Sequence, residues 1–481
     1  MDNARKEYVR ARIAHWDRAS AAYGKPGRIG AAYHRMLARH LSFMIPKGLR
    51  VLELGCGHGD LLASLSPSVG VGLDFSGKML EEAGRRHPHL SFVQADAAGF
   101  SASEKFDVII LSDLVNDLWD AQEVFSSLSS CCGPDTRIFI NFYNNLWRIP
   151  LGIARRLGLG ADVMEQNWFS PHDVMNLLSI SGFEVLKRTW GIIIPFEIPL
   201  LSRLLNRWLV HFWPFSWLAL TNFIAARPKS GLAPANQANP APIVTVVVPA
   251  RNEEGNITNI LPRIPQMGGG TEVIFVEGNS TDKTWEAIQK VVADNPEKMV
   301  SAYQQPGKGK GDAVRLGFSK ARGDVFMILD ADLTMPPEYL PRFYDALVSG
   351  KGEFINGVRL VYPMEDGSMR FMNMLGNKFF SMAFTWLLGQ PIKDTLCGTK
   401  VLNRNNYEAI CRNRHYFGDF DPFGDFDLLF GAARLNLKIV EIPIRYRFRT
   451  YGETNIDRWR QGFALLKMAA FAASRLKFLK V

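Results

Sequence analysis

The chain has 481 residues, of which 47% are hydrophobic and 21% are charged, so a disordered protein is excluded and two or three folded domains are expected. The formal net charge of +9 favours anionic partners, such as nucleotides or a phospholipid surface. The first twenty residues are charged throughout, so we expect no signal peptide. Five cysteines without a CxxC pair indicate a reducing compartment and no structural zinc site.

A glycine-rich turn follows the first predicted strand. Residues 50–65 read RVLELGCGHGDLLASL, a strand that leads into three alternating glycines and then into a helix. Glycines let the backbone approach a ligand closely, and a helix N-terminus offers free N–H groups. The next strand, VGVGLDFS, ends near Asp74, whose carboxylate could accept hydrogen bonds from ribose hydroxyls. Further strands are predicted in SFVQADA, which holds Asp96, and in FDVIILSDL.

These motifs resemble, over about residues 10–226, the Rossmann-like class I S-adenosylmethionine-dependent methyltransferases. The resemblance implies that Asp74 holds the ribose and that Asp96 faces the adenine. Ser112 and Asp113, at the end of the following strand, would lie near the transferring methyl group. It also implies that four residues line the methionine end of the cofactor: Glu53, Gly55, Gly57 and Gly59.

A nicotinamide-binding Rossmann domain is the alternative for this half. Such sites place a diphosphate on the helix N-terminus, which Glu53 would oppose, whereas a carboxylate suits a cationic sulfonium cofactor. No motif identifies the methyl acceptor, and His172 is interpreted as structural. The aromatic insertion at 190–217 either covers a large apolar acceptor or packs within the fold.

The segment 208–226, WLVHFWPFSWLALTNFIAA, has no charged residue over 19 positions. Pro214 interrupts it and several polar residues lie within it, so we interpret it as an aromatic insertion that leads into a buried strand, LALTNFIAA. A membrane span is the alternative, because a spanning helix needs about 20 mostly apolar residues. Residues 227–242 contain four prolines and little that could build a core, so they predict an interdomain linker.

Both sides of this linker alternate β-branched runs with amphipathic helices, which predicts two α/β domains, at 1–226 and 243–456, each with a mostly parallel sheet. In the second domain, VTVVVPARNEEGNI and EVIFVEGNSTDKTWEAI are each a strand followed by a helix, the second capped by Ser280 or Asp282. A Gly/Lys run then follows, which could cradle phosphate but is not a Walker A loop.

Two aspartates, Asp330 and Asp332, close the apolar run of VFMILDADL with one alanine between them. Side chains two apart on an extended segment point to the same side, so these carboxylates repel each other unless positive charge lies between them. Alone, such a D-x-D is as often a solvated turn as a site.

The ordered pieces VPARNEE, VEGNSTDKT, GKGKGDAVRLGF, DADL and EIPIRYRFRTYGETN resemble, over about residues 243–456, the family 2 glycosyltransferases with the GT-A nucleotide-diphospho-sugar transferase fold. The resemblance is closest to polyprenol-phosphate glycosyltransferases such as dolichol-phosphate mannose synthases. It implies that Asp330 and Asp332 bind Mg²⁺ or Mn²⁺ between themselves and the diphosphate of a nucleotide-sugar donor. The cation would stabilise the departing nucleoside diphosphate.

The same resemblance implies a set of substrate-binding residues. Glu277 replaces the first aspartate of the second strand and Gly278 the second one, while Asn455 follows Thr454 where a lysine is usual. Residues near the base, the ribose and the phosphates would be Pro249, Asn252, Glu253, Glu277, Lys310, Arg359, Arg370 and Arg449.

Asp394, Asp425 and Asp427 are the other candidates for chemistry, together with Arg449. A hydroxyl acceptor would need a carboxylate base, whereas a phosphate acceptor is already anionic and needs only positioning by arginine. If the acceptor is polyprenyl phosphate, these acids orient or balance the arginines. Asp427 serving only as a structural partner is the alternative.

The final segment, 457–481, has six basic residues and one acidic residue, and its apolar residues Phe463, Leu466 and Ala470 follow helical spacing. It predicts an amphipathic helix that either lies on an anionic membrane surface or packs on the catalytic domain. We predict a bifunctional enzyme: methyl transfer from S-adenosylmethionine, and metal-dependent inverting glycosyl transfer to a polyprenyl phosphate or a related lipid or glycan acceptor. The alternative is a glycosyltransferase whose N-terminal domain only binds S-adenosylmethionine or is degenerate. The expected location is the cytoplasm or the cytoplasmic membrane face, without a nucleic-acid partner.

Overall fold

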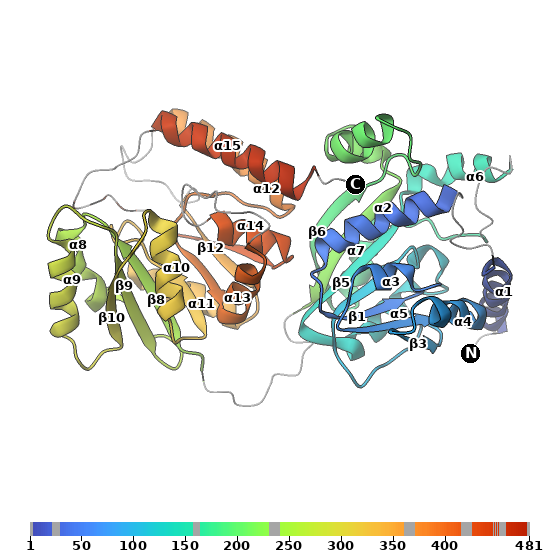
Figure 1. Cartoon of the computed structure of the whole chain (residues 1–481), viewed down its shortest axis with the longest axis horizontal. Helices are drawn as coiled ribbons and strands as arrows, with labels where there is room; N and C mark the ends of the chain where they lie inside the picture. Colours follow the sequence, from blue (N-terminus) through green and yellow to red (C-terminus); the bar gives the residue numbers. More distant parts are fainter. Residues whose placement is uncertain are drawn as a thin grey trace. The chain divides into compact units, whose positions relative to one another are not determined.

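The computed structural model forms two compact units, Met1–Ala235 with Phe478–Val481, and Asn236–Lys477 (Figure 1). It describes residues 3–21, 29–156, 164–229, 241–359, 371–414, 426–445, 447, 449, 451 and 458–478.

The N-terminal unit is built on one seven-stranded sheet in the order β3-β2-β1-β4-β5-β7-β6. Strands β1 to β5 pair in parallel, and β7 runs antiparallel to both β5 and β6. Its strands are β1 (Arg50–Leu54), β2 (Val69–Asp74), β3 (Ser91–Gln94), β4 (Phe106–Ser112), β5 (Cys132–Tyr143), β6 (Phe183–Gly191) and β7 (Thr221–Pro228). Its α-helices are α1 (Asn3–Ala19), α2 (Ile29–Met44), α3 (Asp60–Ser64), α4 (Gly77–Arg86), α5 (Ala121–Ser127), α6 (Arg148–Arg156) and α7 (Pro171–Ile180).

Apolar clusters cover both faces of this sheet because its inner strands are buried on both sides. One cluster joins the sheet to α5 and α7, through Phe125 and Leu178 among others. The second joins it to α2 and α3, through Leu37 and Leu62. The helices begin where polar caps meet their free N–H groups: Asp120 caps α5, and Ser170 caps α7 with a capping box.

The aromatic insertion folds as three short turns, η4 (Arg203–Trp208), η5 (Leu209–His211) and η6 (Phe215–Leu218), which lead into β7. Every residue of β7 is buried, so the prediction of a buried strand is confirmed. The strand ends at Pro228, two residues inside the range predicted as a linker. Within the described residues, the helices are too short or too polar for any of them to cross a membrane.

The C-terminal unit has its own seven-stranded sheet, in the order β10-β9-β8-β11-β13-β12-β14. Strand β13 is antiparallel to both of its neighbours, and the remaining pairs are parallel. Its strands are β8 (Val244–Ala250), β9 (Thr271–Glu277), β10 (Val300–Gln304), β11 (Val325–Ile328), β12 (Phe354–Val358), β13 (Lys400–Asn403) and β14 (Ile439–Pro443). Its α-helices are α8 (Glu254–Ile260), α9 (Thr284–Ala293), α10 (Lys310–Lys320), α11 (Leu340–Val348), α12 (Phe371–Leu388), α13 (Arg404–Arg412), α14 (Phe426–Arg434) and α15 (Arg458–Leu476).

Alternate residues of β11 pack on opposite faces of this sheet. Val325 and Met327 join the main cluster, which also contains Phe343 of α11, whereas Phe326 stacks on Phe318 of α10 with ring centroids 4.9 Å apart. Because β8, β9 and β11 are parallel, their carboxyl ends reach the same edge of the sheet. Ligands bind at this edge in open α/β sheets. The ends of β1, β2 and β4 are arranged in the same way in the first unit.

The predicted caps of α9 have a different role in the structure. The N-cap residue is Lys283, which makes no side-chain cap hydrogen bond, although the Thr284 N–H donates to Asp282. Asp282 and Ser280 also accept from the N–H groups of Glu254 and Asn252, at 3.3 and 3.0 Å. They therefore tie the loop after β9 to the start of α8.

Two helical glycines of the C-terminal unit should respond oppositely to alanine. A Cβ at Gly317 of α10 would collide with the stiff side chain of Val247, whereas a Cβ at Gly376 of α12 would meet open space. We expect Gly317→Ala to lower the free energy of unfolding by about 1–3 kcal/mol. Gly376→Ala should raise it by up to about 1 kcal/mol. Urea unfolding of the full chain measures both, and a stabilised Gly317→Ala protein would contradict the packing.

Candidate functional site

The turn after β1 uses glycines in a conformation that other residues rarely adopt. Gly55, Gly57 and Gly59 have φ values of 71°, 52° and 74°. The N–H of Gly57 donates to Oδ2 of Asp74 at 2.9 Å, and the Ser76 N–H donates to Oδ1 at 2.9 Å. The carboxylate at the end of β2 thus holds the glycine turn and its own loop together.

Glu53 lies beneath this turn and is only 2% exposed. Burial raises its pKa to about 8, and Asp74 and Asp60 add to the rise, although a backbone hydrogen bond from Leu62 opposes it. Its Oε2 is buried without a hydrogen-bond partner. A buried carboxyl group with an unmet oxygen favours a cationic or hydrogen-bond-donating ligand, so the residues fit a positively charged cofactor.

Asp113 follows Ser112 at the end of β4, with a φ of 54°. Its Oδ1 accepts hydrogen bonds from the Tyr33 hydroxyl at 2.9 Å and from Asn141 Nδ2 at 2.8 Å, while its Oδ2 is buried without a partner. Burial raises the pKa of Asp113 to about 7, against the two hydrogen bonds. The next residue, Leu114, packs so closely on Gly55 that a Cβ there would overlap it. Asp113 therefore lies beside the glycine turn.

Sequence reasoning missed the partners of these acids. Tyr33 and Asn141 lie on α2 and β5, far from Asp113 in the chain, and no motif marks them. Asp17 of α1 was also missed; it accepts hydrogen bonds from the side chain of Ser76 and from the Lys78 N–H. Asp96 follows β3, and its Oδ1 accepts from the Ala98 N–H at 3.0 Å.

In the C-terminal unit, each aspartate of the acid pair has a cation of its own. Lys310 Nζ lies 2.6 Å from Oδ1 of Asp330, and an Arg449 guanidinium nitrogen lies 2.8 Å from Oδ2 of Asp332. Arg449 also reaches Glu253, at 3.4 Å. The structure thus brings together five of the predicted residues, contributed by the loops that follow β8, β11 and β14 and by the start of α10.

The charge around Asp330 is strongly positive. Burial acts to raise its pKa, but Lys310, Lys400 and Arg359 together lower it, so the carboxylate is ionised. Gly398 lies against this pair so closely that a Cβ would overlap both the Asp330 carboxylate and the Lys310 ammonium group. Neither Gly398 nor Lys400 was singled out from the sequence.

A divalent cation at the acid pair would have two carboxylates from the protein. Among the described residues, no group of three or more His, Cys, Asp or Glu side chains could hold a metal ion. Oxygen-only ligation by Asp330 and Asp332 suits Mg²⁺ or Mn²⁺, which commonly take their other ligands from phosphate and water. The donor set therefore fits a cation that arrives with a nucleotide diphosphate.

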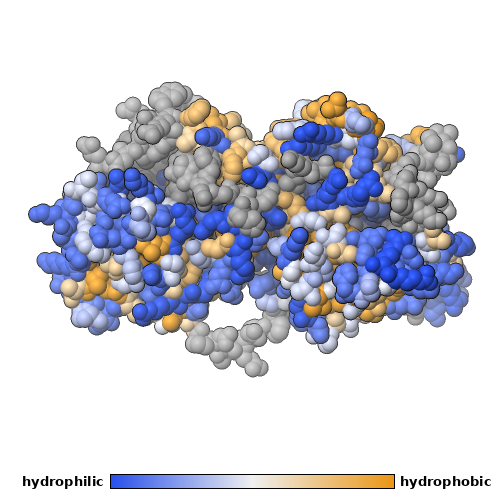
Figure 2. Space-filling model, viewed as in Figure 1, coloured by the Kyte–Doolittle hydropathy of each residue, from blue (hydrophilic) through white to orange (hydrophobic). Residues whose placement is uncertain are grey.

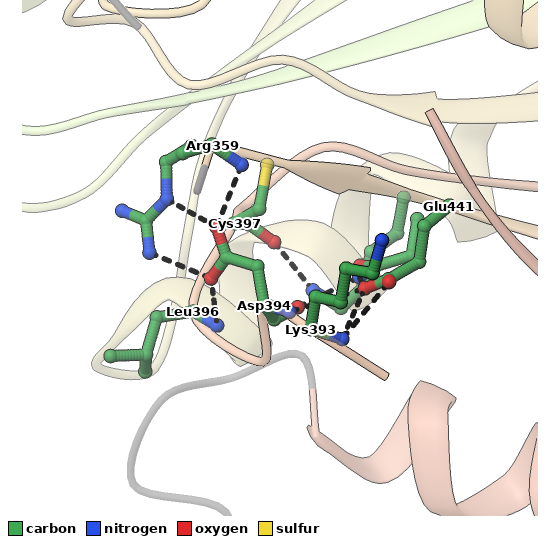
Figure 3. Close-up of polar contacts among 8 residues, drawn as sticks. Arg359, Lys393, Asp394, Leu396, Cys397 and Glu441 are labelled. Carbon is green, nitrogen blue, oxygen red and sulfur yellow. Dashed lines mark hydrogen bonds and ion pairs between the residues drawn. The ribbon is translucent and has the colours of Figure 1, made fainter. Parts of the chain in front are cut away.

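Asp394 forms a bidentate ion pair with Arg359 (Figure 3). Nε and one terminal nitrogen of Arg359 donate at 2.7 and 2.8 Å, and the N–H groups of Arg359 and Leu396 add two bonds at 3.0 Å. Burial acts to raise the pKa of Asp394, but Arg359 and these bonds hold it below its usual value. Glu441 accepts from the N–H groups of Lys393 and Asp394, which fixes this loop. Such a carboxylate positions an arginine and is a poor proton acceptor.

Asp427, the second residue of α14, lies 2.9 Å from a guanidinium nitrogen of Arg414. Burial acts to lower the pKa of Arg414, but Asp427 raises it. Asp427 is therefore placed as the partner of an arginine. Four other predicted positions lie outside the described residues: Arg370, Asp425, Thr454 and Asn455.

The remaining predicted residues lie at the ends of β8 and β9. Pro249 is in β8, and Asn252, with a φ of 55°, accepts from the Thr281 N–H at 2.8 Å. Glu277 ends β9 and accepts from the Ser280 N–H and from Gln304. Pro249 and Asn252 therefore lie in or after β8, the strand that pairs with β11 of the acid pair, and Glu277 lies one strand further away, at the same edge of the sheet.

Comparison with known families assigns both units. The model of "Glycosyl transferase family 2" matches residues 245–411, and a model described as "Methyltransferase domain" matches residues 23–188. The fold classes predicted from the sequence, Rossmann-like methyltransferase and GT-A glycosyltransferase, are confirmed.

Curated relatives match the C-terminal unit. A dolichol-phosphate mannosyltransferase of Pyrococcus furiosus is 30% identical over 219 residues, which is 44% of this chain and 59% of the relative. An undecaprenyl-phosphate 4-deoxy-4-formamido-L-arabinose transferase of Pseudomonas aeruginosa is 27% identical over 46% of this chain and 62% of its own length. The chain thus spans less than two thirds of these two relatives. A dolichyl-phosphate hexose transferase of Haloferax volcanii is 30% identical over 47% of this chain and 91% of its own length.

Solved structures resemble each unit weakly. A glucosyl-3-phosphoglycerate synthase from Mycobacterium tuberculosis, in complex with Mn²⁺ and uridine diphosphate, has a TM-score of 0.37 at 19% identity and covers 49% of this chain and 80% of its own. An S-adenosylmethionine-dependent methyltransferase from Mesorhizobium loti has a TM-score of 0.31 at 20% identity, over 40% and 97% of the two chains. These low scores establish nothing about function. The chain belongs to glycosyltransferase family 2 through its C-terminal unit, and a methyltransferase domain precedes that unit in the same polypeptide.

Proposed function

We propose that the chain is a bifunctional transferase. Its C-terminal domain transfers a sugar, with inversion, from a nucleotide-sugar donor to a polyprenyl phosphate, and its N-terminal domain transfers a methyl group from S-adenosylmethionine. The observation that carries the glycosyltransferase part is the acid pair, in which Asp330 and Asp332 meet Lys310 and Arg449 at the carboxyl edge of the sheet.

The acid pair and its cations suit a diphosphate leaving group. A divalent cation bound there would act as a Lewis acid on the departing nucleoside diphosphate. Lys310 and Arg449 already hold the two carboxylates, so both can turn to the phosphate oxygens when a donor brings its own negative charge. Asn252 and Glu277, at the ends of β8 and β9, would border the nucleoside.

A phosphate acceptor agrees with the way that the other carboxylates are used. Asp394 is bound to Arg359 and Asp427 to Arg414, so each acid orients an arginine. An anionic acceptor needs arginines to position it and needs no proton acceptor. The relatives' names, which include dolichol-phosphate and undecaprenyl-phosphate transferases, support the same class of acceptor.

The methyltransferase part is supported by the unpaired acids beside the glycine turn. Glu53 would meet the positive charge of the methionine end of the cofactor, and Asp74, at the end of β2, would bind the ribose. Asp113 keeps Oδ2 available, so it can hold the hydroxyl proton of a methyl acceptor, with Tyr33 and Asn141 fixing the other oxygen.

The glycosyltransferase proposal is tested with a panel of nucleotide sugars, Mn²⁺ and polyprenyl phosphate, scored for a lipid-linked product. We expect Asp332→Ala to abolish product formation, because Arg449 loses the nearer of its two carboxylate partners and the cation would lose one of two protein carboxylates. S-adenosylmethionine binding, measured by isothermal titration, should be intact in this variant. Full glycosyl transfer by Asp332→Ala would contradict the role of the acid pair.

A second variant distinguishes the two acceptor chemistries. If the acceptor is a phosphate, Asp427→Asn should retain transfer with a raised acceptor KM, because an amide still contacts Arg414 but balances its charge less well. The kcat should fall less than about tenfold, below the usual effect of losing a general base. Abolished transfer to a lipid phosphate, in a variant that unfolds like the parent protein, would show that Asp427 is needed as a base.

The carboxyl group of Glu53 should lower the stability of the folded protein as pH rises, while it contributes to cofactor binding. Its pKa is about 8 in the folded protein and 4.5 by its ordinary value, so between these values the folded state keeps a proton that the unfolded state loses. The free energy of unfolding therefore falls as pH rises, by at most about 1.4 kcal/mol per pH unit.

Glu53→Gln should remove this loss, so its gain in thermal stability over the wild type should be largest above pH 8. Its affinity for S-adenosylmethionine should fall at least tenfold, which corresponds to about 1.4 kcal/mol of binding free energy. Calorimetry and melting curves measure the two effects. Glu104→Gln, at a side chain that is 67% exposed, is the control and should change neither. A Glu53→Gln protein that binds the cofactor normally would remove Glu53 from the site.

A further inference from the structure

Large hydrophobic side chains are exposed together on the methyltransferase domain. Of the seventeen that are exposed in the described part of the N-terminal unit, thirteen lie in the segments 146–153 and 196–218. For the second of these segments, Figure 2 shows an orange area over the short helical turns drawn in green in Figure 1. The thirteen are Leu146, Ile149, Ile153, Phe196, Ile198, Leu200, Leu201, Leu204, Trp208, Phe212, Trp213, Trp217 and Leu218.

Hydrogen bonds join the two segments into one surface, called here the aromatic face. The indole N–H of Trp147 donates to the carbonyl of Leu218 at 3.0 Å. The side-chain amide of Asn144 donates to the carbonyls of Trp217 and Ala219, at 3.0 and 2.9 Å. The residues just before α6 and the turn η6 are therefore neighbours, which brings the two apolar segments together on one side of the domain.

The aromatic face is held outward by an ordered framework. Buried Asn206 accepts from the N–H groups of Ile193 and Ile194, at 2.8 and 3.0 Å, and donates to the Ile194 carbonyl at 2.7 Å. Val210 and Ala219 form a small core beneath it. Because the inner positions are filled, Leu200 and Trp213 remain 82% and 73% exposed. A contiguous exposed apolar area of this kind marks a binding surface.

The charges within the two segments are almost all positive. Residues 145–156 and 196–218 contain five arginines and one acid, Glu197. That acid is paired with Arg35 at 3.0 Å, so it does not offset the arginines of the face. The five are Arg148, Arg155, Arg156, Arg203 and Arg207.

We propose that the aromatic face binds the surface of an anionic lipid bilayer. Segments that lie in the membrane interface combine tryptophan, phenylalanine and leucine with arginine. Their apolar side chains enter the bilayer to a depth of about 5–10 Å, and their cations stay at the head groups. The charge complementarity favours an anionic bilayer over a neutral protein surface. This membrane contact belongs to the N-terminal domain, and it stands whether or not the glycosyl acceptor is a polyprenyl phosphate.

The test is co-sedimentation of the full chain with vesicles of phosphatidylcholine and phosphatidylglycerol, compared with phosphatidylcholine alone. The wild type should bind the anionic vesicles and bind the neutral ones much more weakly, and high salt should release it. Each interfacial side chain removes apolar surface from water when it enters the bilayer. Replacing Leu200, Trp213 and Trp217 together by serine should therefore weaken vesicle binding by at least about tenfold.

Three exposed apolar residues of the same unit outside the face provide the matched control: Val69, Val93 and Ile180, also changed to serine. The control variant should bind vesicles as the wild type does. Quenching of tryptophan fluorescence by bromine-labelled acyl chains should occur in the wild type and be reduced in Trp213→Tyr/Trp217→Tyr, which reports insertion independently of any folding defect.

Four results would overturn the proposal, and the last of them would assign the face to contact between copies of the chain. The first is equal binding of the wild type and the aromatic-face variant. The second is binding to both vesicle types alike, which removes the role of the arginines. The third is loss of binding only when Phe463 and Leu466 of α15, which are 72% and 48% exposed, are changed to serine, since that assigns membrane binding to the C-terminal helix. Self-association that the aromatic-face variant loses, without vesicle binding by the wild type, would identify an interface between copies.

Discussion

A carboxylate that is wholly or partly buried must be met by a cation, a hydrogen-bond donor or a proton, and the two domains meet this constraint in opposite ways. In the glycosyltransferase domain, Asp330 and Asp332 are each neutralised by the protein's own lysine or arginine. In the methyltransferase domain, Glu53 and Asp113 each keep a buried oxygen without a hydrogen-bond partner. The first arrangement suits an anionic ligand that can take over the cations, and the second suits a ligand that carries positive charge or a proton.

The sequence predicted both folds because the informative residues are local. Alternating glycines after a buried strand, and acids that close an apolar run, report strand ends directly, and strand ends form the ligand edge of a parallel sheet. The order of the five motifs in the second half then identified the family, although Glu277 and Gly278 depart from its pattern. The buried strand after the aromatic insertion was also predicted from local residues, because Pro214 and several polar side chains interrupt the uncharged run.

The residues that complete the sites could not be predicted, because their effect arises from contacts across the fold. Tyr33 and Asn141 fix Asp113 although they are 80 and 28 positions away. Arg414, which pairs with Asp427, has no recognisable motif, and Gly398 is needed only because Asp330 and Lys310 pack against its backbone. The role predicted for Asp282 and Ser280 was incomplete. Such residues before a helix usually cap it, but here they also accept hydrogen bonds from the N–H groups of Glu254 and Asn252, at the start of α8.

The buried position of Glu53 has a consequence for how its pocket exchanges ligands. With a pKa of about 8, the side chain is mostly protonated at neutral pH when it has no ligand, so it adds little negative charge to the pocket. A cation that binds beside it stabilises the ionised form, and the proton must leave. Binding is then an exchange of one positive charge for another, and loss of that charge from the bound molecule after reaction would draw a proton back to Glu53.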